Sequence, residues 1–403
     1  MKFDYVIVGA GLSGCVVAEQ LAKSENKKIL IVEKRNHIAG NCYDFRNENN
    51  ILIHKYGPHI FHTNNWRVWE YLSQFTEWEK YQHKVLANVD GILVPVPFNL
   101  NSIYKCFSKV TAEKIEEKLL EKYQFGTKIP ILKLKSEYDS LLETLFDLIY
   151  NKVFHGYTVK QWDLYPRELD GDVMARIPVS INRDDRYFQD KYQGIPKQGY
   201  TKLIEKMLYK PNIHLLLNTD YFAIKNELQY EKLIFTGMLD EFFEFSFGKL
   251  PYRSLQFEFE TFETNRYQPV AQVNYPSEYD FTRITEFSHF FEHQNFHSKT
   301  TIAREFPSPF NNILMSSNNN IYRNDIYSNK FCNSESLSHS SDSKKIPYYP
   351  VPMQRNENLA IKYKRQAKKL QDVIFLGRLA DYSYYNMDQA VARALEVCNK
   401  ILK

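Results

Sequence analysis

The sequence has few cysteines, and they are widely scattered. Its 403 residues hold five, with no Cys-x-x-Cys pair among them: Cys15, Cys42, Cys106, Cys332 and Cys398. An odd number at such spacing argues against a disulfide framework and against the common zinc sites. This usage is typical of a reducing compartment, and we therefore expect a cytoplasmic protein.

Long apolar runs and a strong net charge are also missing. No uncharged apolar run approaches the ~20 residues that a membrane-spanning helix needs. The start imitates a signal peptide, but Asp4 and a glycine-rich turn interrupt it. The net charge is only +4, without a clustered basic stripe. We therefore expect no integral membrane contact and no nucleic-acid partner, whereas a small anionic substrate would be compatible.

No motif for a catalytic nucleophile or a metal is present either. The chain shows no Ser-His-Asp or paired-carboxylate pattern. His54, His59 and His62 lie close together, but they have no carboxylates nearby, and this is not a known ligand spacing. We expect no metal. Two roles stay open for these histidines, a neutral ring beside a cofactor and a purely structural ring.

What the sequence does contain is a dinucleotide-binding pattern at its start. The run Tyr5–Val8 is typical of a strand buried on both faces, and a glycine-rich turn and a helical pattern follow. Gly9 permits the tight turn, Gly11 lets the backbone approach a pyrophosphate, and Gly14 lets the helix pack close to the strand. A second buried strand ends at Glu33, an acid that can accept hydrogen bonds from the ribose hydroxyls.

The residues after Glu33 favour FAD over a nicotinamide dinucleotide. Lys34, Arg35 and the small pair before Asn41 resemble the second loop of FAD-binding folds, which wraps the adenosine and the pyrophosphate. A nicotinamide domain has no need of this extension.

Composition indicates a soluble, multidomain protein with an aromatic-rich cleft. The length predicts two or three domains, and 43% hydrophobic with 25% charged residues is typical of globular proteins. Aromatic residues make up 15% of the chain and include 29 tyrosines, which often line sugar and nucleotide clefts.

Several longer motifs together resemble the UDP-galactopyranose mutase family. They occur in family order and span nearly the whole chain: HKYGPHIFHT from His54, PVPFN from Pro95, GYTVKQW from Gly156, RIPV from Arg176, RYFQDKYQGIPKQGYTKLIEKML from Arg186, and GRLADYSYYNMDQ from Gly377. The resemblance implies a flavoenzyme that interconverts UDP-galactopyranose and UDP-galactofuranose, the furanose donor for surface polysaccharide.

The resemblance also implies the fold. We expect an α/β protein with a Rossmann-like FAD-binding domain, an inserted small helical domain and a mainly antiparallel β-sheet domain. The expected boundaries are 1–80, 209–245 and 347–403 for the FAD domain, 101–183 for the helical domain with a mobile substrate loop, 81–100, 184–208 and 246–307 for the sheet domain, and 308–346 for a low-complexity insertion.

Local patterns add expectations within these domains. Apolar spacing predicts helices from Ala112 to Tyr123 and from Leu141 to Tyr150. Short strands such as Leu215–Leu217, Leu233–Phe235 and Phe257–Phe259 predict a mainly antiparallel sheet between about residues 212 and 306.

Site residues are carried over from the family position by position. The resemblance implies that FAD is bound by Gly9, Gly11, Leu12, Ser13, Gly14, Glu33, Lys34, Gly40, Asn41, His59, Arg378 and Met387. It implies that the sugar nucleotide is bound by Tyr157, Thr158, Trp162, Arg176, Tyr187, Phe188, Asn274, Arg283, Tyr349, Tyr384 and Asn386. Arg176, Arg283 and His62 are the expected catalytic residues. Family members often have Gly at Ala380 and Asp at Asn386, so this chain departs there.

The implied chemistry has no net redox change. The resemblance implies that N5 of the reduced FAD attacks the anomeric carbon and expels UDP, and that the adduct opens and recloses through the 4-hydroxyl. A UDP-sugar is thus the expected partner, and a homodimer is the family expectation. Three alternatives stay open: a mutase for UDP-N-acetylgalactosamine or a dTDP-deoxysugar, an oxidase of the amine-oxidase type, and a non-catalytic FAD-binding protein.

Overall fold

The structure is a computed structural model that describes residues 2–25, 27–135, 137–164, 178–277, 279–294, 298–310 and 345–402. Three of the expectations above lie outside these residues: the position of Arg176, the loop that carries it, and most of the insertion with Cys332.

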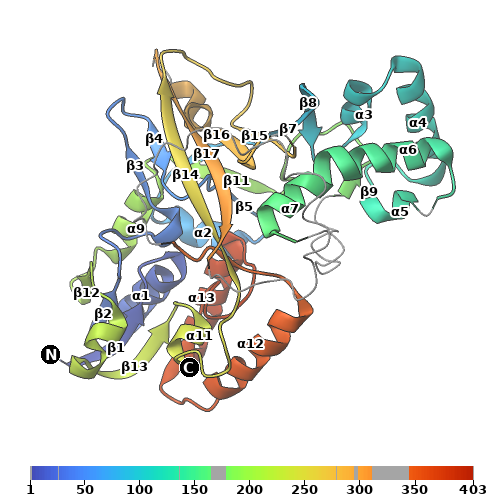
Figure 1. Cartoon of the computed structure of the whole chain (residues 1–403). Coiled ribbons are helices and arrows are strands. Elements are labelled where there is room, and N and C mark those ends of the chain that lie inside the picture. Colours follow the sequence, from blue (N-terminus) through green and yellow to red (C-terminus); the bar gives the residue numbers. More distant parts are fainter. Residues whose placement is uncertain are drawn as a thin grey trace, which may run out of the picture.

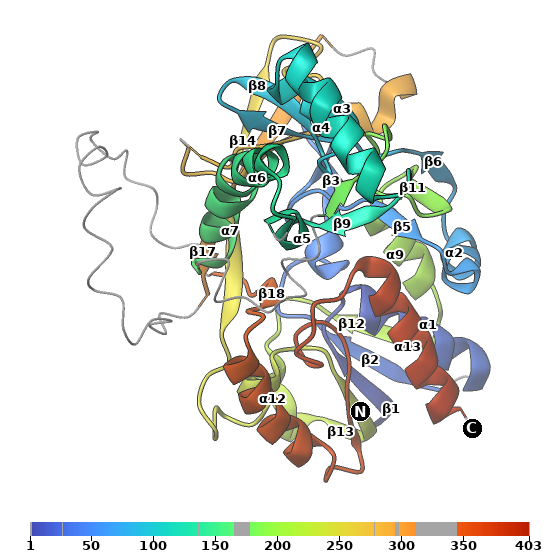
Figure 2. The ribbon, with the colours of Figure 1, turned by 90° about the vertical axis from the view of Figure 1, so that its right-hand side faces the viewer.

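A five-stranded parallel sheet forms one end of the molecule (Figure 1). Its strands are β1 (Lys2–Val8), β2 (Ile29–Val32), β12 (Ile213–Leu216), β13 (Gln229–Phe235) and β19 (Val373–Phe375), in the order β12-β2-β1-β13-β19. Every pair in this sheet is parallel. Both chain termini lie at this end (Figures 1 and 2).

The parallel sheet is buried on both faces, as its unbroken apolar strands predict. Tyr5 and Ile7 belong to a core cluster that includes side chains of the helices α1 (Leu12–Glu25) and α13 (Met387–Ile401). Val6 points to the other face, whose core includes side chains of the short helices there. Other helices at this end include α2 (Trp66–Ser73), α10 (Tyr221–Ile224), η4 (Lys225–Glu227), α11 (Leu239–Phe242) and α12 (Gln354–Ala367).

A seven-stranded sheet in the order β18-β14-β17-β16-β15-β7-β8 forms the middle of the molecule. All its pairs are antiparallel except β15 with β7, which confirms a mainly antiparallel sheet. Its strands are β7 (Val85–Val89), β8 (Ile92–Val96), β14 (Tyr252–Phe262), β15 (Gln272–Asn274), β16 (Arg283–Glu286), β17 (Thr300–Pro309) and β18 (Tyr349–Pro350), and the short helix η5 (Phe287–Gln294) follows β16.

Helices gather at the end opposite the parallel sheet (Figure 1). The predicted helix at 112–123 is confirmed as α4 (Lys109–Lys122), and the one at 141–150 as α6 (Ser140–Leu148), which continues into a π-helical turn, η2 (Ile149–His155). The other elements of this group are α3 (Leu100–Cys106), α5 (Ile131–Lys135), α7 (Gly156–Trp162), β9 (Lys128–Pro130) and β10 (Pro178–Ser180).

Three small elements lie outside the two large sheets. A three-stranded sheet has the order β5-β11-β6, with β5 (Phe61–Thr63), β6 (Trp78–Lys80) and β11 (Tyr192–Pro196). A hairpin joins β3 (Asp44–Arg46) to β4 (Leu52–His54), and η1 (Gly40–Cys42) precedes it.

The structure corrects two expectations about packing. The segments Leu215–Leu217 and Leu233–Phe235 contribute to β12 and β13 of the parallel sheet, so they are not strands of the antiparallel sheet. Helix α9 (Tyr200–Leu208), expected in the sheet domain, packs its apolar face with α1 in the core of the parallel sheet. The domain boundaries otherwise stay a proposal. Among the described residues no helix has the length and apolarity to cross a bilayer.

Buried histidines predict a loss of stability in mild acid. Burial lowers the pKa of His54 and of His83 to about 3, whereas an unfolded histidine titrates near pH 6.5. Between these values only the unfolded chain binds the proton, so the free energy of unfolding falls by ~1.4 kcal/mol per pH unit for each such ring.

We therefore expect chemical denaturation to show stability falling from pH 7 to pH 5, with a shallower fall in the variant His83→Asn. The wild type and the variant should converge by about 2 kcal/mol over this interval. Parallel pH curves for the two proteins would show that His83 is protonated in the folded state.

Candidate active site

The glycine turn after β1 is shaped by close backbone contacts. Gly9 has φ +102°, and a Cβ there would lie 2.2 Å from Oγ1 of Thr236, which donates to the carbonyl of Val8 at 2.6 Å. A Cβ on Gly14 would lie 2.2 Å from the carbonyl oxygen of Gly9. These two glycines are therefore required for packing the turn against the helix and the neighbouring strand.

Gly11 differs from these two, because a Cβ there would make only an ordinary van der Waals contact. Its nearest neighbour would be Cα of Gly40, at 3.9 Å. A Cβ on Gly40 would in turn lie 2.8 Å from Cα of Gly11. The turn and the loop after β2 thus approach each other closely and leave a backbone surface that a phosphate group can reach.

Glu33 ends β2 and holds the turn through its side chain. Its Oε2 accepts from the backbone N–H of Ala10 at 2.8 Å and its Oε1 from that of Arg35 at 2.9 Å. A carboxylate can accept about four hydrogen bonds, so both oxygens can still receive ribose hydroxyls. The guanidinium of Arg35 donates to Asn41 at 2.8 Å and lies over the ring of Tyr56.

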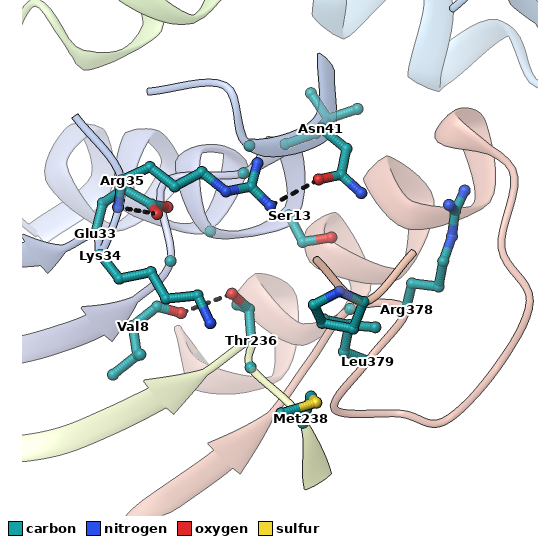
Figure 3. Close-up of a pocket in the computed structure, with 18 of the residues that line it drawn as sticks. Val8, Ser13, Glu33, Lys34, Arg35, Asn41, Thr236, Met238, Arg378 and Leu379 are labelled. Atoms are coloured by element: carbon teal, nitrogen blue, oxygen red, sulfur yellow. Dashed lines mark hydrogen bonds between the residues drawn. The ribbon is translucent and has the colours of Figure 1, made fainter. Parts of the chain in front are cut away.

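Most of these residues line a cavity of about 230 Å³. Figure 3 shows Glu33 and Lys34 on one side of it and Arg378 and Leu379 on the other. The structure brings into its lining every residue predicted for the cofactor: Gly9, Gly11, Leu12, Ser13, Gly14, Glu33, Lys34, Gly40, Asn41, His59, Arg378 and Met387. A cavity lined by a glycine turn and by an acid at the end of β2 fits a dinucleotide such as FAD.

Helix α13 begins at the far end of this cavity. Asn386 and Met387 line the wall, and the backbone N–H of Asn386 donates to Oε1 of Gln389 at 2.8 Å. His59 lines the same region, and burial lowers its pKa to about 4, with further contributions from Arg378 and Arg283. The His59 ring is therefore neutral at pH 7, and it lies near both cations.

An aromatic group adjoins the cavity at Arg378. The guanidinium lies 5.8 Å from the ring centre of Tyr349 and 5.6 Å from that of Tyr384. Both tyrosines pack against Trp162, at 5.8 and 6.1 Å between ring centres. Gln161, next to Trp162 on α7, donates to the hydroxyl of Tyr349 at 3.1 Å.

Arg283 brings a second cation to this aromatic group. Its Nε and Nη2 contact Oε2 of Glu305 at 2.8 and 2.7 Å, and Glu305 is buried directly across the β16–β17 pair. Burial alone would lower the pKa of Arg283, but Glu305 and the tyrosines Tyr157 and Tyr349 outweigh it, and the pKa is raised. Asn274 lies opposite Arg283 in the register of β15 and β16.

Tyr157 and Phe188 approach this site from two different elements. Burial raises the pKa of Tyr157, which lies near enough to Arg283 for the guanidinium to oppose that shift. Phe188 packs edge to face on Tyr187 at 4.9 Å between ring centres. Thr158 is buried beside Tyr157 on α7.

His62, for which a catalytic role is predicted, contacts Asp190 and Phe188. It does not line the cavity: its Nδ1 lies 2.8 Å from Oδ2 of Asp190, and its ring stacks on Phe188 at 3.6 Å. These contacts suit a residue that holds Phe188 in place. Within the described residues no set of three or more His, Cys, Asp or Glu side chains is arranged around a possible metal ion.

Sequence reasoning missed some residues of the site. Glu305 and Thr236 have no motif of their own, and their roles come from the register of β16 with β17 and from the close contact with Gly9. Arg35 was noted only as part of a basic pair, although it bonds Asn41 and covers Tyr56. The chain spacing of these residues carries no signal of their contacts.

Family models match most of the chain. The model described as UDP-galactopyranose mutase covers residues 152–384, and one described as an NAD(P)-binding Rossmann-like domain covers residues 7–75. The second match agrees with the parallel sheet and the glycine turn.

Curated relatives and solved structures are similar over the full length. A Klebsiella pneumoniae protein named "Probable UDP-galactopyranose mutase" is 34% identical, over 99% of this chain and 94% of its own. The dTDP-fucopyranose mutase of Escherichia coli is also 34% identical, over 99% of this chain and 98% of its own. A crystal structure of reduced UDP-galactopyranose mutase shares the fold, with a TM-score of 0.71 at 16% identity, over 100% of this chain and 94% of that one.

Substitutions at Gly11 and at Gly14 distinguish an effect on cofactor binding from an effect on folding stability. Gly11→Ala places a methyl group at the cavity wall without a clash, so the cofactor-free protein should keep its free energy of unfolding within about 1 kcal/mol. Bound flavin should nevertheless fall at least about tenfold in affinity, because the methyl group lies where the pyrophosphate must approach.

The matched variant Gly14→Ala meets a backbone oxygen instead, and it should lose about 1–3 kcal/mol of stability with or without flavin. Denaturant titration of the apoproteins and flavin titration by fluorescence measure the two effects. Full flavin affinity in Gly11→Ala would show that the pyrophosphate does not lie on this turn.

Proposed function

Because the chain belongs to the UDP-galactopyranose mutase family, we propose that it interconverts UDP-galactopyranose and UDP-galactofuranose on a reduced FAD. The family supports a flavin-dependent mutase. That its substrate is UDP-galactopyranose and that its flavin is FAD are our proposals. We further propose that it supplies a furanose donor for surface polysaccharide, acts in the cytoplasm and forms a homodimer.

One observation carries the proposal: the cofactor cavity meets an aromatic group that contains two cations. Arg378 lines the cavity and also lies over Tyr349 and Tyr384. Arg283 forms an ion pair with Glu305. It lies close enough to Tyr349 for its charge to lower the pKa of that tyrosine, against the larger effect of burial. A site for flavin therefore adjoins a site with rings for a base or sugar and with fixed positive charge for a diphosphate.

The residues of the cavity would hold FAD along its length. Gly11 and the first turn of α1 would face the pyrophosphate, and Glu33 would accept from the adenosine ribose. The start of α13, with Asn386 and Met387 in the wall, would place backbone N–H groups near the flavin ring. When bound, a reduced flavin would supply a nucleophilic ring nitrogen and would be unchanged at the end of the cycle.

The residues of the aromatic group would hold the sugar nucleotide. We assign Tyr157 and Phe188 to the uracil and Trp162 to the sugar. Tyr187, Tyr349 and Arg283 are assigned to the diphosphate, and Arg176, outside the described residues, would complete its charge compensation. The remaining predicted contacts to the substrate are Thr158, Asn274, Tyr384 and Asn386.

Fixed cations beside the diphosphate would drive the first step. UDP gains negative charge as it leaves the sugar, so Arg283 stabilises the transition state more than the bound substrate. The carboxylate of Glu305 holds the guanidinium through two of its nitrogens, which reduces its freedom to reorient during the step. We assign His62 to positioning Phe188 through the stacking contact described above.

A second substrate has specific support. The dTDP-fucopyranose mutase of Escherichia coli matches this chain as well as the Klebsiella protein does. A thymine base would also stack on Tyr157 and Phe188, so the two substrates would differ at the sugar, at the 5-methyl group of the base and at the 2′-hydroxyl of the ribose. We place UDP-galactopyranose first because the family model carries that name.

The identity of the cofactor can be measured directly. Protein purified from cells should be yellow and should release FAD on denaturation, because Glu33 and the glycine turn address an adenosine diphosphate that FMN lacks. Chromatography of the released chromophore distinguishes the two flavins. Tightly bound NAD without flavin would contradict the assignment of the cavity.

Substitutions at Arg283 and Arg176 distinguish a catalytic role from simple anion binding. Arg283→Ala and Arg176→Ala should retain FAD yet lose about two to three decades of turnover in the reduced enzyme, because an arginine–phosphate contact of about 2–4 kcal/mol is stronger at the transition state. Arg67→Ala, on the exposed face of α2, serves as the control and should leave turnover unchanged. Wild-type kcat with only a raised KM in both variants would contradict the assigned roles.

A further inference from the structure

Lys160, in the middle of α7, directs its ammonium group at a single turn of the chain. Its Nζ donates to the carbonyl oxygens of Tyr275, Tyr279 and Phe281, the last two at 3.0 and 3.1 Å. All three acceptors lie between the end of β15 and the start of β16. An ammonium group has three donors, and this turn takes all of them.

The turn is built so that these carbonyls converge. The rings of the same three residues pack on one another, with centres 4.9 to 5.1 Å apart. The backbone N–H of Tyr275 donates to the carbonyl of Thr282 at 2.8 Å and closes the turn. Without Lys160 the three carbonyls would lose the single donor group that draws them together.

A second contact ties the same helix to the same turn. A Cβ on Gly156, the first residue of α7, would lie 2.3 Å from the carbonyl oxygen of Pro276. At the other end of α7, the buried Arg253 donates to the carbonyls of Lys160 and Gln161 at 3.1 and 2.9 Å. The position of α7 is therefore specified at its start, its middle and its end.

We propose that Lys160 is a positioning residue for the sugar nucleotide, which fixes α7 against the β15–β16 turn. The inference rests on the function proposed above. Helix α7 carries Tyr157 and Trp162, whereas the two ends of the turn carry Asn274 and Arg283. Lys160 thereby sets the separation between the rings assigned to the base and sugar and the cation assigned to the diphosphate, without touching the substrate itself.

The direct test is the variant Lys160→Met, which keeps the length and apolar stem of the side chain and removes its donors. We expect it to retain flavin and to raise both the Kd for UDP and the KM for the sugar nucleotide at least about tenfold. Lys152→Met is the matched control, because Lys152 is an exposed lysine on the adjoining turn η2, and its partner among the described residues is Asp90. Its affinity for UDP should equal that of the wild type.

A double-mutant cycle distinguishes positioning from a merely structural role. If Lys160 acts through Arg283, then Lys160→Met should change the Kd for UDP less than about threefold in the Arg283→Ala background. A structural defect would instead add to the effect of Arg283→Ala. Additive effects, or wild-type affinity in Lys160→Met, would overturn the proposal.

Gly156→Ala keeps the proposal testable if Lys160→Met does not fold. This variant preserves the lysine and its acceptors but pushes α7 away from Pro276, so it should weaken UDP in the same non-additive way. Unchanged affinity in a folded Gly156→Ala protein would contradict the proposal. A wild-type protein that neither binds UDP nor turns over would overturn the proposed function as well, whereas an active wild type with unaffected variants overturns the role of Lys160 alone.

Discussion

The site depends on how closely the backbone packs at the glycine turn. Gly14 lies so near the carbonyl of Gly9, and Gly40 so near Gly11, that no side chain fits at Gly14 or Gly40. This packing places the start of α1, the loop after Glu33 and the cofactor cavity in fixed relation. Because α13 packs on α1 in the same core, the far end of the cavity is set by the same contacts.

The second constraint is electrostatic. Two arginines stand near one another in a partly buried aromatic group, and each is fixed by oxygen atoms of the protein. Arg283 is held by the buried carboxylate of Glu305, and Arg378 by the carbonyl of Tyr385 at 2.5 Å. Cations held in this way need little reorientation when charge develops on a leaving diphosphate, which is the usual source of electrostatic catalysis.

Much of this was predictable because its causes are local. The glycine spacing, the apolar strand before it and the acid after β2 are dictated by contacts among neighbours in one βαβ unit, and all of them line the cavity or support it. Helices α4 and α6 follow from apolar spacing in the same way. The residues of the cofactor cavity could therefore be named from sequence together with the family resemblance.

The rest depends on packing that the sequence does not record. The amphipathic pattern of α9 shows that it has a buried face, but not that this face meets α1. Short strands such as β12 and β13 look alike in parallel and antiparallel sheets, so their sheet was partly misassigned. Glu305 became visible only through the register of β16 and β17, and the sequence likewise carries no signal that His62 stacks on Phe188.

The most direct measurement is product analysis after anaerobic incubation with UDP-galactofuranose, once with dithionite-reduced and once with oxidised protein. The account predicts conversion to UDP-galactopyranose by the reduced protein, little conversion by the oxidised protein, and no net consumption of reductant over many turnovers. A parallel incubation with dTDP-fucopyranose determines which sugar is preferred. Failure of the reduced protein to isomerise any nucleotide sugar, or stoichiometric oxidation of substrate, would contradict the proposed mutase activity.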